Sequence, residues 1–249
     1  MRQKFAVLLT LSIAVVAVAV ITSYSGGRGT TPHKVRQLEE KGKRQKLSFA
    51  ELAQLAKARG ERQVVVPGVA TLYPNATTPE ELNGSLPEYA VFVAEMVAEK
   101  SYLASRLQPG GESPSELIKS WYKFKVLDAI SEGRPHPSFA VRELPTELLP
   151  VAADEVLVPA EGGTVVIDGV EVTQHEESVA RFRRNRKYLL LLSVEPATRV
   201  GELAFGPQSV LPLSADGGLD AGQDQHILQR AIKQFHGGSI RQLKAGGRR

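Results

Sequence analysis

The chain of 249 residues contains no cysteine, one tryptophan and two methionines. The lack of cysteine excludes disulfide bonds, thiolate zinc sites and a cysteine nucleophile. Several enzyme motifs are also absent: H-E-x-x-H, G-x-S-x-G, the phosphate-binding glycine loop that ends in Lys-Ser or Lys-Thr, and the dinucleotide fingerprint. The sequence therefore predicts no catalytic residue, no metal site and no cofactor, and it favours a binding or structural role over an enzymatic one.

Positive charge is scarce in the middle of the chain, although the net charge is +4. Residues 1–60 hold 11 basic and 3 acidic side chains, and residues 225–249 hold 6 basic and no acidic ones. Residues 61–224 hold 14 basic and 24 acidic side chains. Because a nucleic-acid-binding domain carries positive charge on the folded surface that meets the phosphates, this charge distribution argues against nucleic acid as a partner. The basic ends are typical of membrane-proximal or solvated tails.

Residues 5–22 form an uncharged apolar run that follows Arg2 and Lys4. As a helix, about 18 residues span roughly 27 Å, enough to cross a thin bilayer. The run predicts a transmembrane signal-anchor within residues 1–25. A cleaved export signal and a buried soluble helix are the alternatives, because no clear cleavage site decides between them.

The orientation of this segment has conflicting signals. Basic residues in the polar linker 26–47 outnumber those before the apolar run, which by the positive-inside rule favours a cytoplasmic domain. A short basic segment that leads directly into an apolar run is, however, the usual design for export. We give the export signal more weight and expect a single-pass protein of the bacterial inner membrane with a periplasmic domain.

The clearest folding pattern lies in residues 162–194. Two apolar runs, residues 164–167 and 170–172, flank Asp168-Gly169, a turn that tolerates positive φ and predicts a tight β-hairpin. The run from Tyr188 to Leu192 is too continuous for a half-exposed strand and too short for a stable helix. We expect a strand that is buried on both faces.

Further strands are expected at residues 63–66, 200–205 and 209–213, and the alternating residues 120–130 predict a half-buried strand. Over residues 89–103 the periodicity fits a helix and a strand equally well.

Helices are predicted at both ends of this β-rich region. Ser48 and Glu51 have the spacing of a capping box for a helix that ends at Gly60. Asp224 is a candidate N-cap for an amphipathic helix near the C-terminus, and the basic tail 237–249 is expected to be disordered.

The strand-like VFVAEMVAEKSYL, the run WYKFKVLDAI, a hairpin with Gly-Gly, and FRRNRKYLLLL before an L-x-F-G-x turn resemble a group of bacterial exported proteins. In that group a domain of this kind follows a signal or anchor, and the likeness covers residues 89–220. The resemblance implies that residues 89–103 form a strand in a small, partly open antiparallel β-barrel of OB-like or netrin-module type. It implies no catalytic residue, and the proline-rich insert 133–159 departs from the pattern and leaves the middle strand order open.

The expected fold is therefore mainly β, with four parts along the chain. These are a transmembrane segment 1–25, a polar basic linker 26–47, a single β-rich domain 48–236 with peripheral helices, and the tail 237–249.

The densest functional feature of the folded region is a basic cluster of five cations within seven residues: Arg181, Arg183, Arg184, Arg186 and Lys187. Guanidinium groups bind phosphates and carboxylates through paired hydrogen bonds, so the cluster could bind a lipid headgroup, a wall polymer or a nucleic-acid backbone. The alternative is a solvated loop that keeps the following leucine run soluble.

Two other patterns have structural explanations. Ser120 and Lys123 have the S-x-x-K spacing of serine acyl-enzymes, but on a strand these side chains point to opposite faces. Asp216, Asp220 and Asp224 recur in a glycine-rich loop and could contact Ca²⁺, although capping and turn formation also explain them.

Three functions stay open. The first is a membrane-anchored, non-enzymatic envelope module that binds a protein or an anionic polymer. The second is an anion- or nucleic-acid-binding barrel that uses residues 181–187, and the third is a hydrolase whose residues come together only in the fold.

Overall fold

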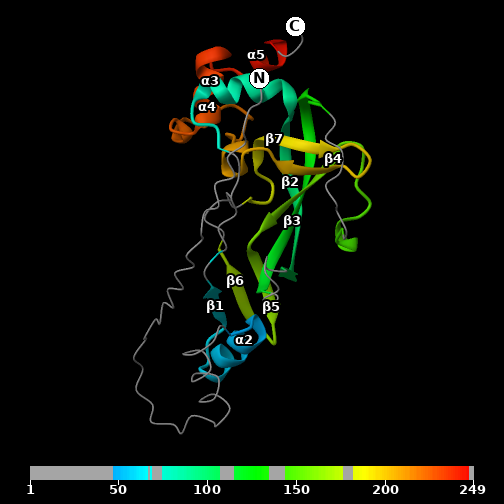
Figure 1. The fold of residues 1–249 in the computed structure, drawn as a ribbon, viewed down its shortest axis with the longest axis vertical. Helices are drawn as coiled ribbons and strands as arrows, with labels where there is room; N and C mark the ends of the chain where they lie inside the picture. Colours follow the sequence, from blue (N-terminus) through cyan, green and yellow to red (C-terminus); the bar gives the residue numbers. More distant parts are fainter. Residues whose placement is uncertain are drawn as a thin grey trace, which may run out of the picture.

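The structure is a computed structural model that describes residues 47–66, 68, 75–106, 115–134, 144–175 and 182–246. Strands dominate this part of the chain and form two sheets at different levels of an elongated molecule (Figure 1). The fold is mainly β, as the sequence predicts. The expected transmembrane segment and linker lie outside the described residues, and no helix within those residues has the length and apolar character to span a membrane.

The larger sheet has six strands in the order β2-β3-β4-β8-β7-β9. Their bounds are β2 Ala90–Arg106, β3 Ser115–Ser131, β4 Glu155–Glu161, β7 Lys187–Glu195, β8 Val200–Leu203 and β9 Val210–Pro212. β2 also pairs with β7, so the pairings through β2, β3, β4, β8 and β7 return to their starting strand. The β2–β3 ladder has three register shifts, irregularities of the kind that bend a strand.

β7 is the central strand of the core. Every residue from Tyr188 to Val194 is buried, which confirms the predicted doubly covered strand. Leu190 and Leu192 pack with Phe124 in one apolar cluster, while Leu189 and Leu191 pack in another beneath the C-terminal helices. β2 also contributes side chains to both clusters. This explains why the periodicity of residues 89–103 fits a helix and a strand equally well.

The smaller sheet has three strands in the order β1-β6-β5, with β1 Gln63–Val66, β5 Gly163–Ile167 and β6 Val170–Gln174. Asp168 and Gly169 have φ values of 50° and 81°, which confirms the predicted hairpin turn. Helix α2, Phe49–Ala58, packs on one face of this sheet, and Ser48 and Glu51 form the expected capping box.

The two sheets are joined where β4 continues into β5 through Gly162. The Ser120 hydroxyl donates to the Gly162 carbonyl at 2.6 Å, and the Ile118 amide donates to the Gln174 side chain at 2.7 Å. A Cβ atom on Gly163 would lie 2.1 Å from the Ser120 Oγ atom, so only glycine fits at this crossing. Ser120 is therefore a buried part of the junction.

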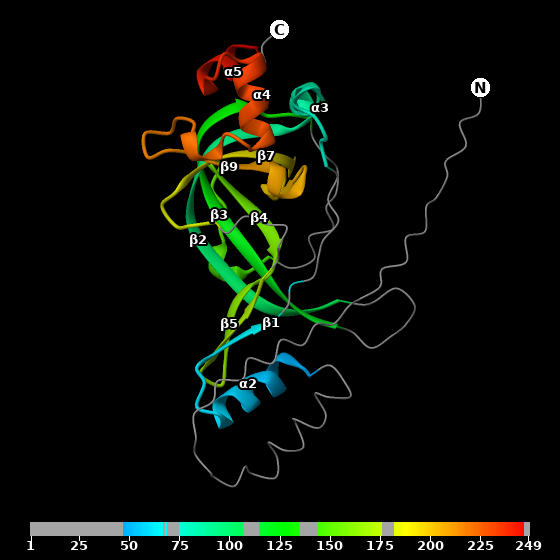
Figure 2. The same cartoon turned by 90° about the vertical axis from the view of Figure 1, so that its left-hand side faces the viewer.

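Three helices cover the opposite end of the molecule: α3 Pro79–Ser85, α4 Ile227–Phe235 and α5 Ile240–Gly246 (Figure 2). Two predictions are wrong here. The N-cap of α4 is His226 rather than Asp224. Residues 240–246 are helical rather than disordered, because Leu243 is buried in the core and Lys244 forms an ion pair with Asp128.

Short 3₁₀ helices complete the described fold: η1 Leu86–Glu88, η2 Thr146–Leu148, η3 Gly206–Ser209 and η4 Ala221–Gln223. The strands expected at 200–205 and 209–213 are confirmed as the shorter β8 and β9, with η3 between them.

Candidate anion-binding site

The described part of the basic cluster, residues 183–187, forms a tight turn, the basic turn, that leads into β7. Asn185 has a φ of 60°, and the Arg186 amide donates to the Arg183 carbonyl at 3.2 Å. The turn is also bonded to β2, because the Asn185 amide donates to the Met96 carbonyl at 2.8 Å and the Met96 amide donates to the Arg186 carbonyl at 3.1 Å. Hydrogen bonds to the sheet therefore fix the backbone of residues 183–186. Arg181 lies outside the described residues.

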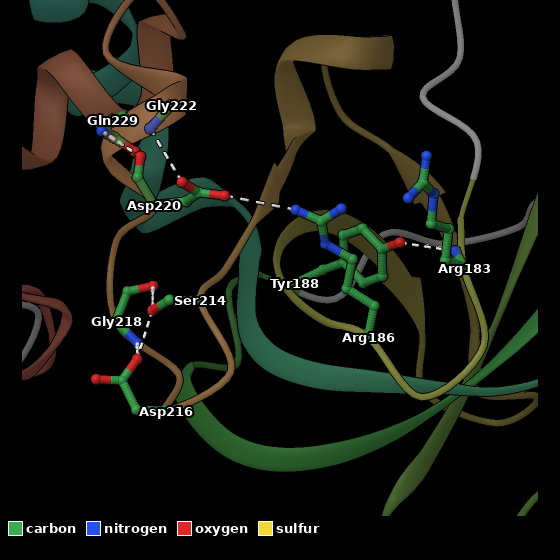
Figure 3. A network of polar contacts seen from close by, with 9 residues as sticks. All are labelled: Arg183, Arg186, Tyr188, Ser214, Asp216, Gly218, Asp220, Gly222 and Gln229. Carbon is green, nitrogen blue, oxygen red and sulfur yellow. Dashed lines mark hydrogen bonds and ion pairs between the residues drawn. The ribbon is translucent and has the colours of Figure 1, made fainter.

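Aromatic rings form the base of this turn. Phe182 lies edge-to-face against Tyr122, Phe124 and Tyr188, with ring centroids 4.8 to 5.3 Å apart. The Tyr188 hydroxyl accepts a hydrogen bond from the Arg183 amide at 2.7 Å (Figure 3). Burial raises the pKa of Tyr188 above its ordinary value, so the phenol is neutral when it accepts this bond.

The structure separates the four described cations of the cluster into two pairs. Arg186 lies 3.5 Å from the Asp220 carboxylate (Figure 3). The Lys187 ammonium group donates to the Ala215 carbonyl at 2.9 Å. Arg183 and Arg184 are exposed, and neither side chain forms an ion pair with another described residue. Among the described cations of the cluster, this second pair is exposed to a ligand.

Asp216 and Asp220 belong to a loop that stabilises itself. The Ser214 hydroxyl donates to Asp216 and lowers the pKa of that carboxyl group, and the Gly222 amide donates to Asp220 at 2.9 Å (Figure 3). No group of three potential metal-binding His, Asp or Glu side chains occurs among the described residues. The two carboxylates therefore act in turns and in the contact with Arg186.

Asp224 makes its contacts with helix α4. It accepts hydrogen bonds from the Lys233 ammonium group at 2.7 Å and from the Gln229 amide at 2.8 Å. The bond from Lys233 lowers the pKa of Asp224. Gln229 is fully buried, and its Oε1 atom has no hydrogen-bond partner.

Opposite charges alternate across the strands beside the basic turn. Glu155 of β4 is opposite Lys125 of β3, which is opposite Glu95 of β2, which is opposite Lys187 of β7. Opposite charges in directly facing positions stabilise a sheet modestly. This row places Glu95 opposite Lys187, whereas the exposed Arg183 and Arg184 lie outside the paired strands.

The S-x-x-K pattern does not form a catalytic pair. Ser120 is buried at the sheet junction, whereas the Lys123 ammonium group lies 3.0 Å from Glu155 and donates to the Pro150 carbonyl at 2.9 Å. The two side chains point to opposite faces of β3, as strand geometry predicts.

A separate hollow of about 640 Å³ lies between residues 144–151 and the β7–β8 turn. It is lined by Leu144, Leu149, Pro150, Val151, Ala197, Thr198 and Arg199. Sequence reasoning missed this feature, because its two walls are far apart in the chain and neither contains a recognisable motif.

Comparison of the chain with models of known protein families and with curated proteins finds no match.

Proposed function

We propose that this protein is a non-enzymatic, membrane-anchored binding module of the bacterial cell envelope, and that it presents Arg183 and Arg184 to an anionic partner. The observation that carries the proposal is the contrast within one turn: its backbone is bonded to β2 and to Tyr188, while these two guanidinium groups are exposed. A fixed backbone reduces the conformational entropy that binding would otherwise cost. Guanidinium groups suit phosphate and carboxylate ligands.

The aromatic residues of the turn favour some anions over others. Phe182 and Tyr188, which could stack on nucleic-acid bases, are 6% and 1% exposed. Single-strand recognition depends on accessible aromatic faces. A phosphate- or carboxylate-bearing headgroup or wall polymer therefore fits the turn better than single-stranded nucleic acid.

The closed series of strand pairings supports a finer description of the scaffold. We infer that β2, β3, β4, β8 and β7 form a small barrel that is only partly closed, since β4 and β8 share one residue pair. The basic turn enters this barrel at the start of β7, so the barrel would hold it in place.

The test is retention of the full chain, in non-ionic detergent, on a heparin column as salt is raised. Arg183→Gln with Arg184→Gln should elute at clearly lower salt than the unchanged protein. The matched control is Arg230→Gln with Arg241→Gln, which removes the same charge from exposed positions on α4 and α5. Equal shifts in the two double variants would show that retention depends on net charge alone and would overturn the proposal.

The membrane location requires its own experiment. The apolar residues 5–22 would anchor the chain, and the domain would lie on the periplasmic side. Protease added to cells with a permeabilised outer membrane should then remove a tag placed after Arg249. Protection of the tag until the inner membrane is lysed would place the domain in the cytoplasm.

A further inference from the structure

We infer that the hollow between residues 144–151 and the β7–β8 turn binds a small amphiphile, a hydrocarbon chain that ends in a carboxylate. This site is separate from the basic turn and does not depend on the function proposed for it. It is a shallow hollow of about 640 Å³ that is open to solvent, so a ligand would lie along its wall and keep part of its surface in water.

The wall of the hollow is mainly apolar. Leu144, residues 149–151 and Ala197 provide hydrocarbon surface, and Leu149 is 43% exposed. Leu144 and Val151 also pack against the buried cluster that contains Trp121. A hydrocarbon chain placed here would remove this surface from water, which is favourable by about 25 cal/mol per Å² of apolar area.

Arg199 supplies the polar end of the site. Its Nε atom donates to the Glu155 carbonyl at 3.0 Å, which fixes the guanidinium plane and leaves the terminal nitrogens as donors for a carboxylate. The nearby Lys123 and Glu155 side chains compensate each other at 3.0 Å. Glu195, on the same turn, directs one carboxylate oxygen to the Ala197 amide at 3.2 Å.

The backbone of this turn also points to a binding role. Arg199 has a φ of 56°, an unfavourable value for a residue with a side chain, and such residues concentrate at functional sites. The neighbouring Thr198 Oγ1 atom is shielded from solvent, so a carboxylate in the hollow would accept hydrogen bonds from the Arg199 guanidinium group rather than from this hydroxyl.

The fluorescence of Trp121 can report ligand binding, because Trp121 is the only tryptophan of the chain and packs beside the wall of the hollow. The experiment titrates the full chain in amphipol with octanoate and, separately, with octanol, and follows tryptophan fluorescence. Octanoate should give a saturable change with an affinity about tenfold higher than that of octanol, as expected for one charge-assisted contact of about 1.4 kcal/mol.

Two variants locate the site. Arg199→Gln should reduce octanoate affinity about tenfold, which is 1.4 kcal/mol, and leave octanol binding unchanged. Ala197→Trp should fill the hollow and reduce the affinity for both compounds; direct calorimetric binding replaces fluorescence for this variant, because it adds a second tryptophan. Octanoate and octanol also partition into the amphipol, to the same extent for the unchanged protein and its variants. Differences in affinity between these proteins therefore report binding in the hollow.

No saturable binding of octanoate, or equal octanoate affinity in all three proteins, would overturn the inference. So would selective binding of a short peptide with an apolar C-terminal residue in place of octanoate, because the site would then accept a peptide carboxylate. If Ala197→Trp fails to fold, Arg199→Gln decides alone: a loss of octanoate affinity supports the inference and unchanged affinity contradicts it.

Discussion

The Tyr188 hydroxyl and the Arg183 backbone amide are joined by a hydrogen bond of 2.7 Å. This contact connects the most buried strand of the core to the exposed turn that carries the candidate binding arginines. The position of the arginines therefore depends on the packing of β7.

Tyr188→Phe should lower the free energy of unfolding by about 1 to 3 kcal/mol, because the Arg183 amide loses its acceptor near the buried ring. It should also lower the salt concentration at which heparin releases the protein, since the turn is less well fixed. Tyr102→Phe is the matched control: it removes a hydroxyl that accepts from Trp121 at 3.0 Å, far from the turn. An unchanged elution position for Tyr188→Phe would show that the bond does not position the arginines.

Asp220→Asn should have the opposite effect on heparin retention. The contact between Arg186 and Asp220 is 3.5 Å long and about one third exposed, so its loss should change stability by less than about 1 kcal/mol. Without the carboxylate, Arg186 becomes available to an anionic ligand and elution should move to higher salt. Thermal unfolding of the same variant separates a charge effect from a folding defect, and earlier elution would contradict the assignment.

Two glycines should respond in opposite directions to alanine. Gly163→Ala places a methyl group on the Ser120 hydroxyl at a φ of 135°, and we expect a loss of more than about 2 kcal/mol. Gly84→Ala lies in α3 with open space around it, and helix propensity should stabilise the protein by about 0.5 to 1 kcal/mol. Chemical denaturation measures both, and similar stabilities for the two variants would contradict the crowded junction.

Acidification should weaken the C-terminal helices before the rest of the fold. Burial lowers the pKa of His226 and of His236 below their ordinary value of 6.5. Between the lowered folded pKa and 6.5 the unfolded chain binds more protons than the folded chain, so the free energy of unfolding falls as the pH drops through this window. In His226→Asn with His236→Gln, thermal unfolding between about pH 7.5 and 6 should depend less on pH; an unchanged dependence would contradict this role.

Thr198→Val should stabilise the free protein by about 1 kcal/mol, because it removes a buried hydroxyl that has no partner and keeps the side-chain shape. Thr146→Val is the control at an exposed position in η2, where the change should stay within about 0.5 kcal/mol. A destabilised Thr198→Val would mean that the hydroxyl is satisfied in the free protein.

Local patterns predicted the parts of the fold that depend on neighbouring residues. The capping box at Ser48, the Asp168-Gly169 turn and the buried run of β7 each have their cause within a few positions of the chain. The strand β2 could not be derived from periodicity, because it is covered on both faces and its apolar side chains follow no single period. The helix α5 depends on a distant contact between Lys244 and Asp128.

From the sequence, the candidate site was predictable only as a cluster of basic residues. The sequence indicated a dense basic cluster but not that Asp220 would pair with Arg186 while Arg183 and Arg184 are exposed. That division depends on the return of a loop after β9 to the start of β7. The hollow beside Arg199 depends in the same way on two segments that only the tertiary fold brings together.

The central claim is that Arg183 and Arg184 contact the anionic partner, and the salt dependence of binding to a defined polyanion tests it most directly. A labelled single-stranded oligonucleotide of about ten residues serves as a polyanion of defined charge and not as the proposed partner, because each phosphate contact contributes about 0.7 to the slope of log K against log salt. Replacement of both arginines by glutamine should make this slope shallower by about 1.4, with a much smaller change in the Arg230 and Arg241 control. A slope equal to that of the unchanged protein would contradict the claim.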